Sequence, residues 1–197
     1  MKDPELFNNN NIPGDDPKPI TVKRFVFEIL QTILLAFLLY FAIDAVVARV
    51  RVENISMQPT LKPGEFLLVN KLAYKLGSVG RGDIIVFHFP KDPSDDYIKR
   101  AIGLPGDHVR IENGRVYINS AQLNETYTMA DPTYNGEWNV PQDAIFALGD
   151  NRNQSSDSHS WGFVPMDNLV GKAFFIYWPL NEIKSLKQMQ IVEAATK

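Results

Sequence analysis

Residues 84 to 102 read IIVFHFPKDPSDDYIKRAI, and they indicate the fold class of the chain. The first six residues form an apolar run that ends at Pro90. A second run, 97–102, ends at the turn-forming residues 103–107. Short apolar runs bounded by Pro, Gly and Asp are typical of β-strands rather than helices. We therefore expect two neighbouring strands here.

The same pattern continues on both sides of this stretch. Residues 109–111 and 116–118 alternate around Asn113-Gly114, which is a strong signal for a tight β-hairpin. Other short apolar runs are found at 66–69, 144–148 and 173–178. Because no long amphipathic helix accompanies them, we predict a mostly β domain built on antiparallel β-sheet.

The domain boundaries follow from these runs. The β-rich domain is expected over 49–180, with a small inserted hairpin around 108–140. Within that insertion, 122–139 is polar and is expected to be a surface loop. The pattern leaves the tail at 181–197 open between a short helix and a frayed end.

A single long apolar segment, 25–48, precedes the β-rich part. It has 24 residues, and about 20 helical residues cross the hydrocarbon core of a bilayer. Its acidic members, Glu28 and Asp44, lie near the two ends. We predict one transmembrane helix, preceded by a disordered polar tail at 1–24. A buried helix is the first alternative.

A cleaved signal peptide is the second alternative for the apolar segment, because Val46-Val47-Ala48 could pass as a cleavage site. The apolar stretch is, however, longer than the usual core of about 7–15 residues. Basic residues on both sides of the span give only a slight preference for an inside N-terminus.

Composition narrows the function. The chain has 197 residues and a formal net charge of -3, so no basic excess indicates nucleic acid. It lacks cysteine, which excludes disulfides, thiolate zinc sites and cysteine nucleophiles. The histidines at 88, 108 and 159 form no metal-binding motif, and the loop from Asp150 lacks calcium-loop spacing. We therefore expect no metal and no cofactor.

Ser56 is the candidate nucleophile. It lies in the segment 54–61, NISMQPTL, where Pro59 disfavours helix and favours an extended or turn backbone. Serine needs a base, and Lys99 is the candidate. Strand alternation puts Lys99 on one face with Tyr97 and Ala101, where burial could lower its pKa. The alternative is that Lys99 is solvated on an edge strand.

A third polar cluster runs from Gly149 to Gly162 and reads GDNRNQSSDSHSWG. It is either an ordinary loop or a loop that orients the base.

Four segments in this order after an apolar span resemble the sequence boxes of bacterial type I signal peptidases, over roughly 25–178. The matching segments are Ser56-Met57-x-Pro59-Thr60-Leu61, Gly82-Asp83-Ile84-Ile85-Val86-Phe87, Lys99-Arg100-x-x-Gly103-x-Pro105-Gly106-Asp107, and Gly149-Asp150-Asn151 with Ser155-x-Asp157-Ser158.

The resemblance implies roles for these residues. Ser56 would be the nucleophile and Lys99 the general base, oriented by a hydrogen bond from Ser155. The Ser56 N–H would be one oxyanion donor. Arg100 would form an ion pair with Asp150, and Asp157 would brace the loop.

The chain departs from the family pattern at two positions. Asn54 stands where some members have a second hydroxyl donor to the oxyanion, so that an amide would have to donate instead. His159 stands where many members have arginine, and is interpreted as structural. The substrate-pocket positions, for which plain core packing is the alternative, are Val52, Met57, Leu61, Tyr97 and Ile98.

The implied function is a membrane-anchored serine endopeptidase that cuts signal peptides from exported preproteins after a small-x-small motif. Its partners would be signal peptides and the lipid bilayer, with no nucleic acid. The N-terminus would be cytoplasmic and the catalytic domain would lie on the outer face of the cell membrane. Two alternatives remain: another Ser/Lys self-processing protease, and a non-catalytic membrane-anchored peptide-binding β-domain.

Overall fold

The structure is a computed structural model that describes residues 22–186. Most of the expected N-terminal tail, 1–21, and the last part of the C-terminal tail, 187–197, lie outside the described residues. The first element is the helix α1, Val22–Val46, none of whose residues is buried. It is long and apolar enough to cross a membrane. It begins three residues before the predicted span and ends two residues before the predicted end.

The helix ends early because Val47 and Ala48 enter a strand. The chain divides into two units after residue 41, so the last turn of α1 belongs to the second unit. In chain order the strands are Val47–Arg51 (β1), Phe66–Asn70 (β2), Ile84–Phe89 (β3), Asp92–Gly103 (β4), His108–Glu112 (β5), Arg115–Ile118 (β6), Ala121–Gln122 (β7), Gly136–Asn139 (β8), Ala144–Leu148 (β9), Val164–Pro165 (β10), Leu169–Trp178 (β11) and Lys184–Ser185 (β12).

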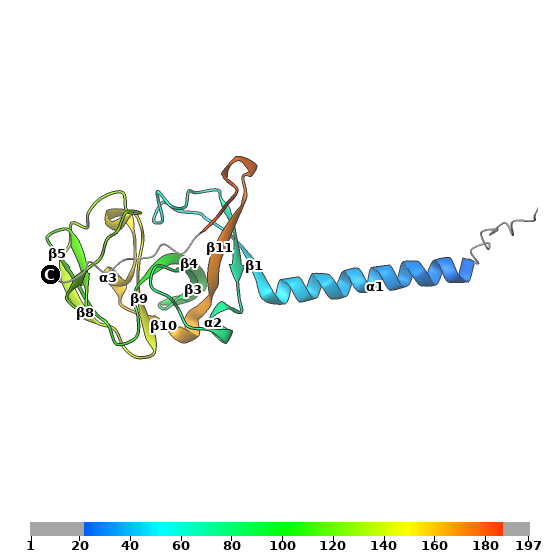
Figure 1. Cartoon of the computed structure of the whole chain (residues 1–197), viewed down its shortest axis with the longest axis horizontal. Helices are drawn as coiled ribbons and strands as arrows, with labels where there is room; N and C mark the ends of the chain where they lie inside the picture. Colours follow the sequence, from blue (N-terminus) through cyan, green and yellow to red (C-terminus); the bar gives the residue numbers. More distant parts are fainter. Residues whose placement is uncertain (1–21, 187–197) are drawn as a thin grey trace, which may run out of the picture. The chain divides into compact units, whose positions relative to one another are not determined.

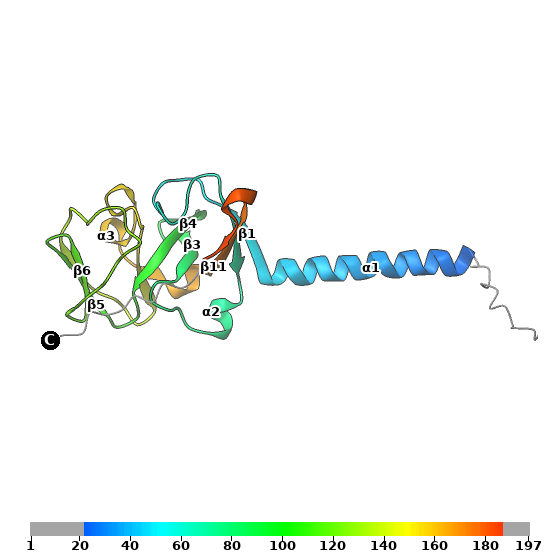
Figure 2. The ribbon, with the colours of Figure 1, turned by 45° about the horizontal axis from the view of Figure 1, so that its top comes forward.

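Within 22–186 these strands form two sheets, and the expectation of a mostly antiparallel β fold is confirmed. The larger has the order β1-β2-β11-β3-β4-β9-β10, with β12 paired to β11. The smaller has the order β7-β6-β5-β8 and includes the predicted hairpin, in which Ile111 pairs with Val116 across Asn113 and Gly114. Figures 1 and 2 show the smaller sheet, with β5, β6 and β8, at the end of the β domain opposite β1.

Short helical turns connect the strands of the described chain. They are the α-helical turns Ala73–Leu76 (α2) and Ser158–Trp161 (α3), and the 3-10 turns Arg152–Gln154 (η1), Met166–Asn168 (η2) and Leu180–Glu182 (η3). Asp157 caps α3 by accepting a hydrogen bond from the backbone N–H of His159. This cap orients Asp157, which lies beside the site described below.

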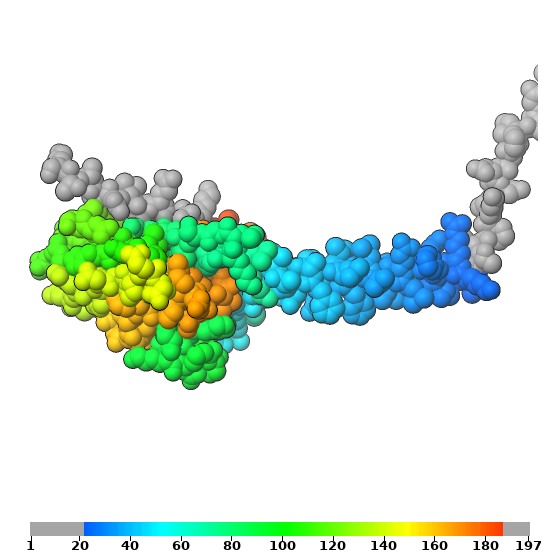
Figure 3. Space-filling model, turned by 90° about the horizontal axis from the view of Figure 1, so that it is seen from below, coloured from blue at the N-terminus to red at the C-terminus, as the bar shows by residue number. Residues whose placement is uncertain are grey.

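The apolar runs recognised in the sequence form the cores of the two sheets. One cluster fills the smaller sheet and contains Val109, Ile118 and Phe146. Two others lie on either side of the larger sheet, because alternate residues of one strand point to opposite faces: Ile98 packs in one and Tyr97 in the other. Figure 3 shows segments early in the chain (turquoise) beside late ones (orange), as the pairing of β2 with β11 requires.

The expectation that 122–139 is a surface loop is wrong in part. Leu123 and Tyr127 are each 3% exposed, and Gly136–Asn139 forms β8. The reason is tertiary: Tyr127 fits beneath a buried arginine of the larger sheet, a contact that local polarity cannot reveal. At the other end, the 3-10 turn η3 (Leu180–Glu182) and β12 (Lys184–Ser185) form the start of the tail, which the sequence left open between a short helix and a frayed end.

Candidate active site

Ser56 lies in a series of turns that follows β1. The backbone N–H of Leu61 donates to the carbonyl of Met57 at 2.9 Å, and that of Gln58 donates to Ile55 at 3.1 Å. The side chains of Met57 and Leu61 are 1% and 0% exposed and anchor the turns in the core. Ser56 itself is 5% exposed, so its hydroxyl is held in place by the packing on either side.

Lys99 on β4 meets this hydroxyl. Its Nζ donates to Ser56 Oγ at 2.8 Å, across 43 residues of sequence. Lys99 is 2% exposed, and the ammonium also lies over the Tyr97 ring at 5.2 Å. Burial lowers the pKa of Lys99 to about 8, although the carboxylates of Asp157 and Asp150 act in the opposite direction. The alternative of a solvated edge-strand cation is therefore wrong.

Asn54 occupies the other side of the hydroxyl. Its Oδ1 accepts both the Ser56 Oγ–H at 2.6 Å and the Ser56 backbone N–H at 3.1 Å. A hydroxyl has one proton to donate. In this arrangement Ser56 therefore donates to Asn54 and accepts a hydrogen bond from Lys99 Nζ.

Arg100, the residue after the candidate base, forms a buried ion pair with Asp150. Its Nε and Nη2 donate to the two carboxylate oxygens at 2.8 and 2.6 Å. The two side chains are 1% and 0% exposed. Thr60 Oγ1 donates to the same carboxylate at 2.5 Å, and Arg100 Nη1 donates to the Gly82 carbonyl at 2.8 Å. Together these contacts link all four sequence segments that carry the resemblance.

Asp157 braces the fourth segment, to which it belongs. Its Oδ2 accepts the backbone N–H of Gly149 at 2.9 Å. Its Oδ1 accepts the N–H of His159 at 3.2 Å and contacts His159 Nδ1 at 2.6 Å. The Tyr134 ring stacks on the imidazole with 3.9 Å between centroids. His159 is thus placed against Asp157, and within residues 22–186 its hydrogen bonds go to Asp157 rather than to Ser56.

The structure does not form the hydrogen bond between Ser155 and Lys99 that the resemblance implies. Ser155 Oγ is buried and lacks a hydrogen-bond partner among the described residues. The side chain lies against Gly149, where an added Cβ would come within 2.2 Å of Ser155 Oγ. Ser155 therefore lies beside the site without a hydrogen bond to the base.

A groove of about 460 Å³ runs past Ser56. Four of the five predicted pocket residues line it: Val52, Met57, Tyr97 and Ile98. Leu61 does not, because it is fully buried in the core. One wall is the first half of β4, and β9 pairs with β4 only from Arg100 onward. In the described chain, that half therefore has one edge without a strand partner.

Several residues that support the site were missed in the sequence. The N–H of Asn151 donates to the Ser56 carbonyl at 3.0 Å, and Glu125 forms an ion pair with the buried Arg152. Asn151 could have been found, since it follows Asp150 in a matching segment. Glu125 lies in the polar stretch between strands and carries no local signal. Among the residues described, no group of three or more His, Asp or Glu could hold a metal ion.

Comparison with known proteins places the chain near one family of enzymes. The sequence model of the family described as "Signal peptidase, peptidase S26" matches residues 23–178. Probable signal peptidase I-2 of Synechocystis sp. is 43% identical over 164 residues, which cover 79% of this chain and 75% of that protein. Signal peptidase I of Leptolyngbya laminosa is 42% identical over 170 residues, covering 82% and 84%.

A crystal structure of a signal peptidase I from Enterococcus faecalis is 32% identical in sequence. The aligned region covers 48% of this chain and 95% of the chain in that crystal structure, with a TM-score of 0.44. The match to the family model spans both the apolar helix and the β domain that carries Ser56 and Lys99. By that match and by the identity to its relatives, the chain belongs to the signal peptidase family, peptidase S26.

Proposed function

We propose that the chain is a membrane-anchored serine endopeptidase that removes signal peptides from exported preproteins, with Ser56 as nucleophile and Lys99 as general base. The observation that carries the proposal is the 2.8 Å contact between Lys99 Nζ and Ser56 Oγ at a site where Lys99 is 2% exposed. Desolvation is what makes a lysine usable as a base near neutral pH.

The chemistry follows from these contacts. Neutral Lys99 takes the proton of Ser56 as Oγ attacks the scissile carbonyl carbon. The resulting ammonium then gives that proton to the leaving amine, and the acyl group remains on Ser56. Water, deprotonated by Lys99, attacks this ester and releases the signal peptide with a new carboxylate, while Lys99 returns the proton to Ser56 Oγ. No metal or cofactor takes part in these steps.

The oxyanion needs donors that are engaged elsewhere in the unliganded site. Asn54 Oδ1 accepts the Ser56 N–H, so the substrate carbonyl oxygen must replace it as the acceptor. Rotation of the Asn54 side chain would then turn its NH₂ group toward the oxyanion as a second donor. Once in place, a donor to the oxyanion contributes about 3 kcal/mol to the stability of the transition state.

The groove suits an extended peptide. The unpaired edge of β4 can accept a strand through main-chain hydrogen bonds, with alternate side chains turned toward the wall of Val52, Met57 and Ile98. Because Val52 and Met57 are 3% and 1% exposed, that wall is shallow and closely packed. It would admit alanine and exclude larger side chains, which is the small-x-small preference.

The membrane part of the proposal rests on α1. The helix has 25 residues, and its acidic members Glu28 and Asp44 lie close to its two ends. We assign α1 as a single-pass anchor with the N-terminus cytoplasmic and the β domain on the outer face. The partners are then the lipid bilayer and the signal peptides of preproteins.

The test is cleavage of a preprotein with an Ala-x-Ala site by the full chain in detergent. We expect a cut after the second Ala, and no cut by Ser56→Ala or Lys99→Ala. The exposed residues Ser78 and Lys75 supply matched controls, since Ser78→Ala and Lys75→Ala should keep full activity.

Two outcomes would contradict the proposal. If Lys99→Ala cuts as fast as the parent, the base lies elsewhere. If the parent binds the peptide but does not cut it, and Ser56→Ala binds equally well, a non-catalytic peptide-binding domain explains the chain better.

A further inference from the structure

Arg152 is a buried cation in the loop that follows β9. It is 1% exposed, and its guanidinium forms a bidentate ion pair with Glu125. Nη1 donates to Oε2 at 2.7 Å and Nη2 donates to Oε1 at 2.5 Å. Burial alone would lower the pKa of Arg152, but the hydrogen bonds with Glu125 raise it above its ordinary value. Arg152 therefore stays charged, and Glu125 is the counterion.

A further donor of Arg152 points at the backbone of Gly149. Arg152 Nε donates to the Gly149 carbonyl at 3.1 Å, while Asp157 accepts the Gly149 N–H at 2.9 Å. Both peptide groups of Gly149 are thus held. The contact with the nucleophile is close, because a Cβ on Gly149 would lie 2.5 Å from the Ser56 carbonyl oxygen. Any shift of Gly149 moves the backbone of Ser56.

Glu125 has a second connection to the site. Tyr127 Oη donates to Glu125 Oε1 at 2.6 Å, and the Tyr127 ring lies 4.1 Å from the Arg100 guanidinium. Arg100 is the neighbour of Lys99 on β4 and the partner of Asp150. One carboxylate therefore contacts both the group that holds Gly149 and the ring that packs on the strand of the base.

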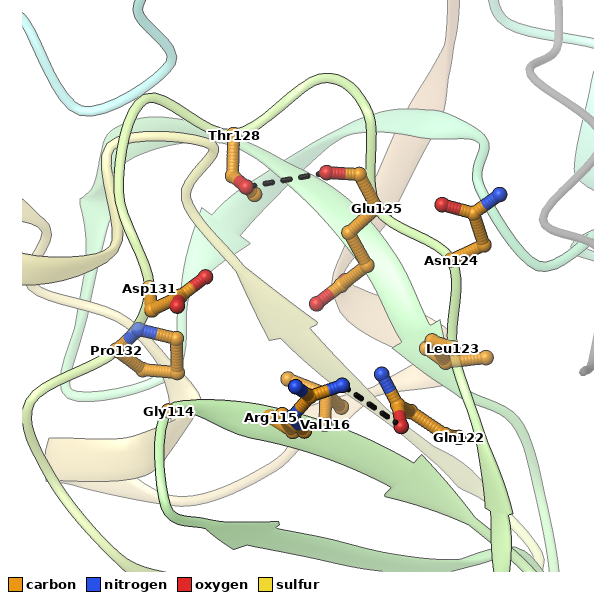
Figure 4. A pocket seen from close by; sticks show the side chains of 10 residues that line it. All are labelled: Gly114, Arg115, Val116, Gln122, Leu123, Asn124, Glu125, Thr128, Asp131 and Pro132. Carbon is orange, nitrogen blue, oxygen red and sulfur yellow. Dashed lines mark hydrogen bonds between the residues drawn. The ribbon is translucent and has the colours of Figure 1, made fainter.

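Glu125 is held by its neighbours in the smaller sheet. It lies in the connection between β7 and β8, where Thr128 Oγ1 donates to the Glu125 carbonyl at 3.2 Å. Figure 4 shows Glu125 on the wall of a cavity of about 470 Å³, with Arg115 and Gln122 joined by a hydrogen bond on another wall. The side chain is 11% exposed, so it reaches from this cavity inward to Arg152.

We propose that Glu125 is a positioning residue for the Ser56–Lys99 pair, acting through Arg152 on Gly149 and through Tyr127 on Arg100. The inference rests on the proposed function, since it assigns Glu125 to that same site. It makes the connection between β7 and β8 part of the catalytic machinery rather than a separate surface feature.

The experiment is steady-state cleavage of an Ala-x-Ala peptide by the full chain in detergent, at a temperature where tryptophan fluorescence shows each variant to be folded. Glu125→Gln keeps the shape and removes the charge. A displacement of reacting groups by about 1 Å costs up to about 10²-fold in rate. We expect kcat to fall at least tenfold and KM to stay within about twofold, because Glu125 does not line the groove.

The control is Glu137→Gln on β8, whose side chain is 63% exposed, and it should behave as the parent. A second variant, Glu125→Gln with Arg152→Gln, leaves no unpaired buried charge and should recover thermal stability. Its kcat should stay low, because the Gly149 carbonyl has lost its guanidinium donor. This variant also serves if Glu125→Gln alone does not fold.

A parent-like kcat in Glu125→Gln, or recovery of kcat together with stability in the double variant, would overturn the positioning role. Ser56→Ala in the same assay separates this result from a failure of the proposed function. Activity that survives Ser56→Ala overturns the nucleophile assignment, whatever Glu125 does.

Discussion

The pH dependence of cleavage is the most direct consequence of the buried lysine. With a pKa of about 8, Lys99 is about one-tenth neutral at pH 7 and about nine-tenths neutral at pH 9. Since only the neutral amine accepts the Ser56 proton, kcat/KM should rise about tenfold between these pH values and then level off. A lysine with an ordinary pKa would give a rise of about a hundredfold over the same range, with no plateau by pH 10.

The assay is kcat/KM for an Ala-x-Ala peptide from pH 6 to pH 10 in one mixed buffer at constant ionic strength. The chain has no cysteine, so Lys99→Cys supplies a unique thiol. Alkylation with 2-bromoethylamine rebuilds a side chain of lysine length whose sulfur makes the amine less basic. The midpoint of the profile should then move to lower pH. An unmoved midpoint, or a flat parent profile, would refute a lysine base.

The same pKa predicts a change in stability that needs no substrate. Between pH 8 and 10.5 the unfolded chain binds a proton at Lys99 that the folded chain has released. Because the unfolded state binds more protons there, the free energy of unfolding rises with pH, by about 3 kcal/mol over the window. Urea unfolding followed by tryptophan fluorescence should show this rise in the parent and not in Lys99→Met.

Substitutions at three further positions test the surroundings of Ser56 and Lys99. Asn54→Asp replaces the amide donor by an acceptor and should lower kcat about 10²-fold, whereas Asn54→Ser keeps a donor and should stay within about fivefold in single-turnover assays. Asp150→Asn removes the partner of buried Arg100 and should cost about 3–5 kcal/mol in urea unfolding; a loss below about 1 kcal/mol would contradict the burial argument. Gly149→Ala places a Cβ 2.5 Å from the Ser56 carbonyl oxygen, so activity should be lost even where the protein folds, as circular dichroism would show.

The local parts of the fold could be predicted from the sequence. Asn113 and Gly114 take positive φ angles of 51° and 75°, which is what the hairpin between 109–111 and 116–118 needs. The apolar runs at 84–89 and 97–102 form strands as expected, and the structure pairs them with each other. These features depend on neighbours in the chain, and local patterns report such neighbours.

Other parts depend on distant partners. Residues 92–96 are polar and exposed, so nothing in their pattern marks them as the first half of β4; the pairing with β3 extends them. The burial of Lys99 follows from distant segments, such as the turns that carry Ser56, 43 residues away. Glu125 is a third case, because the role proposed for it depends on Arg152, which lies 27 residues away.

The direct passage of α1 into β1 has one more consequence. Strand pairing begins at Val47, one residue after the helix ends, and Ser56 follows only ten residues after Val46. At about 3.3–3.6 Å per residue, the nucleophile lies within about 36 Å of the helix end along the chain. With α1 in the bilayer, enzyme and anchored preprotein meet by lateral diffusion in two dimensions, so that surface density rather than bulk concentration governs their encounter.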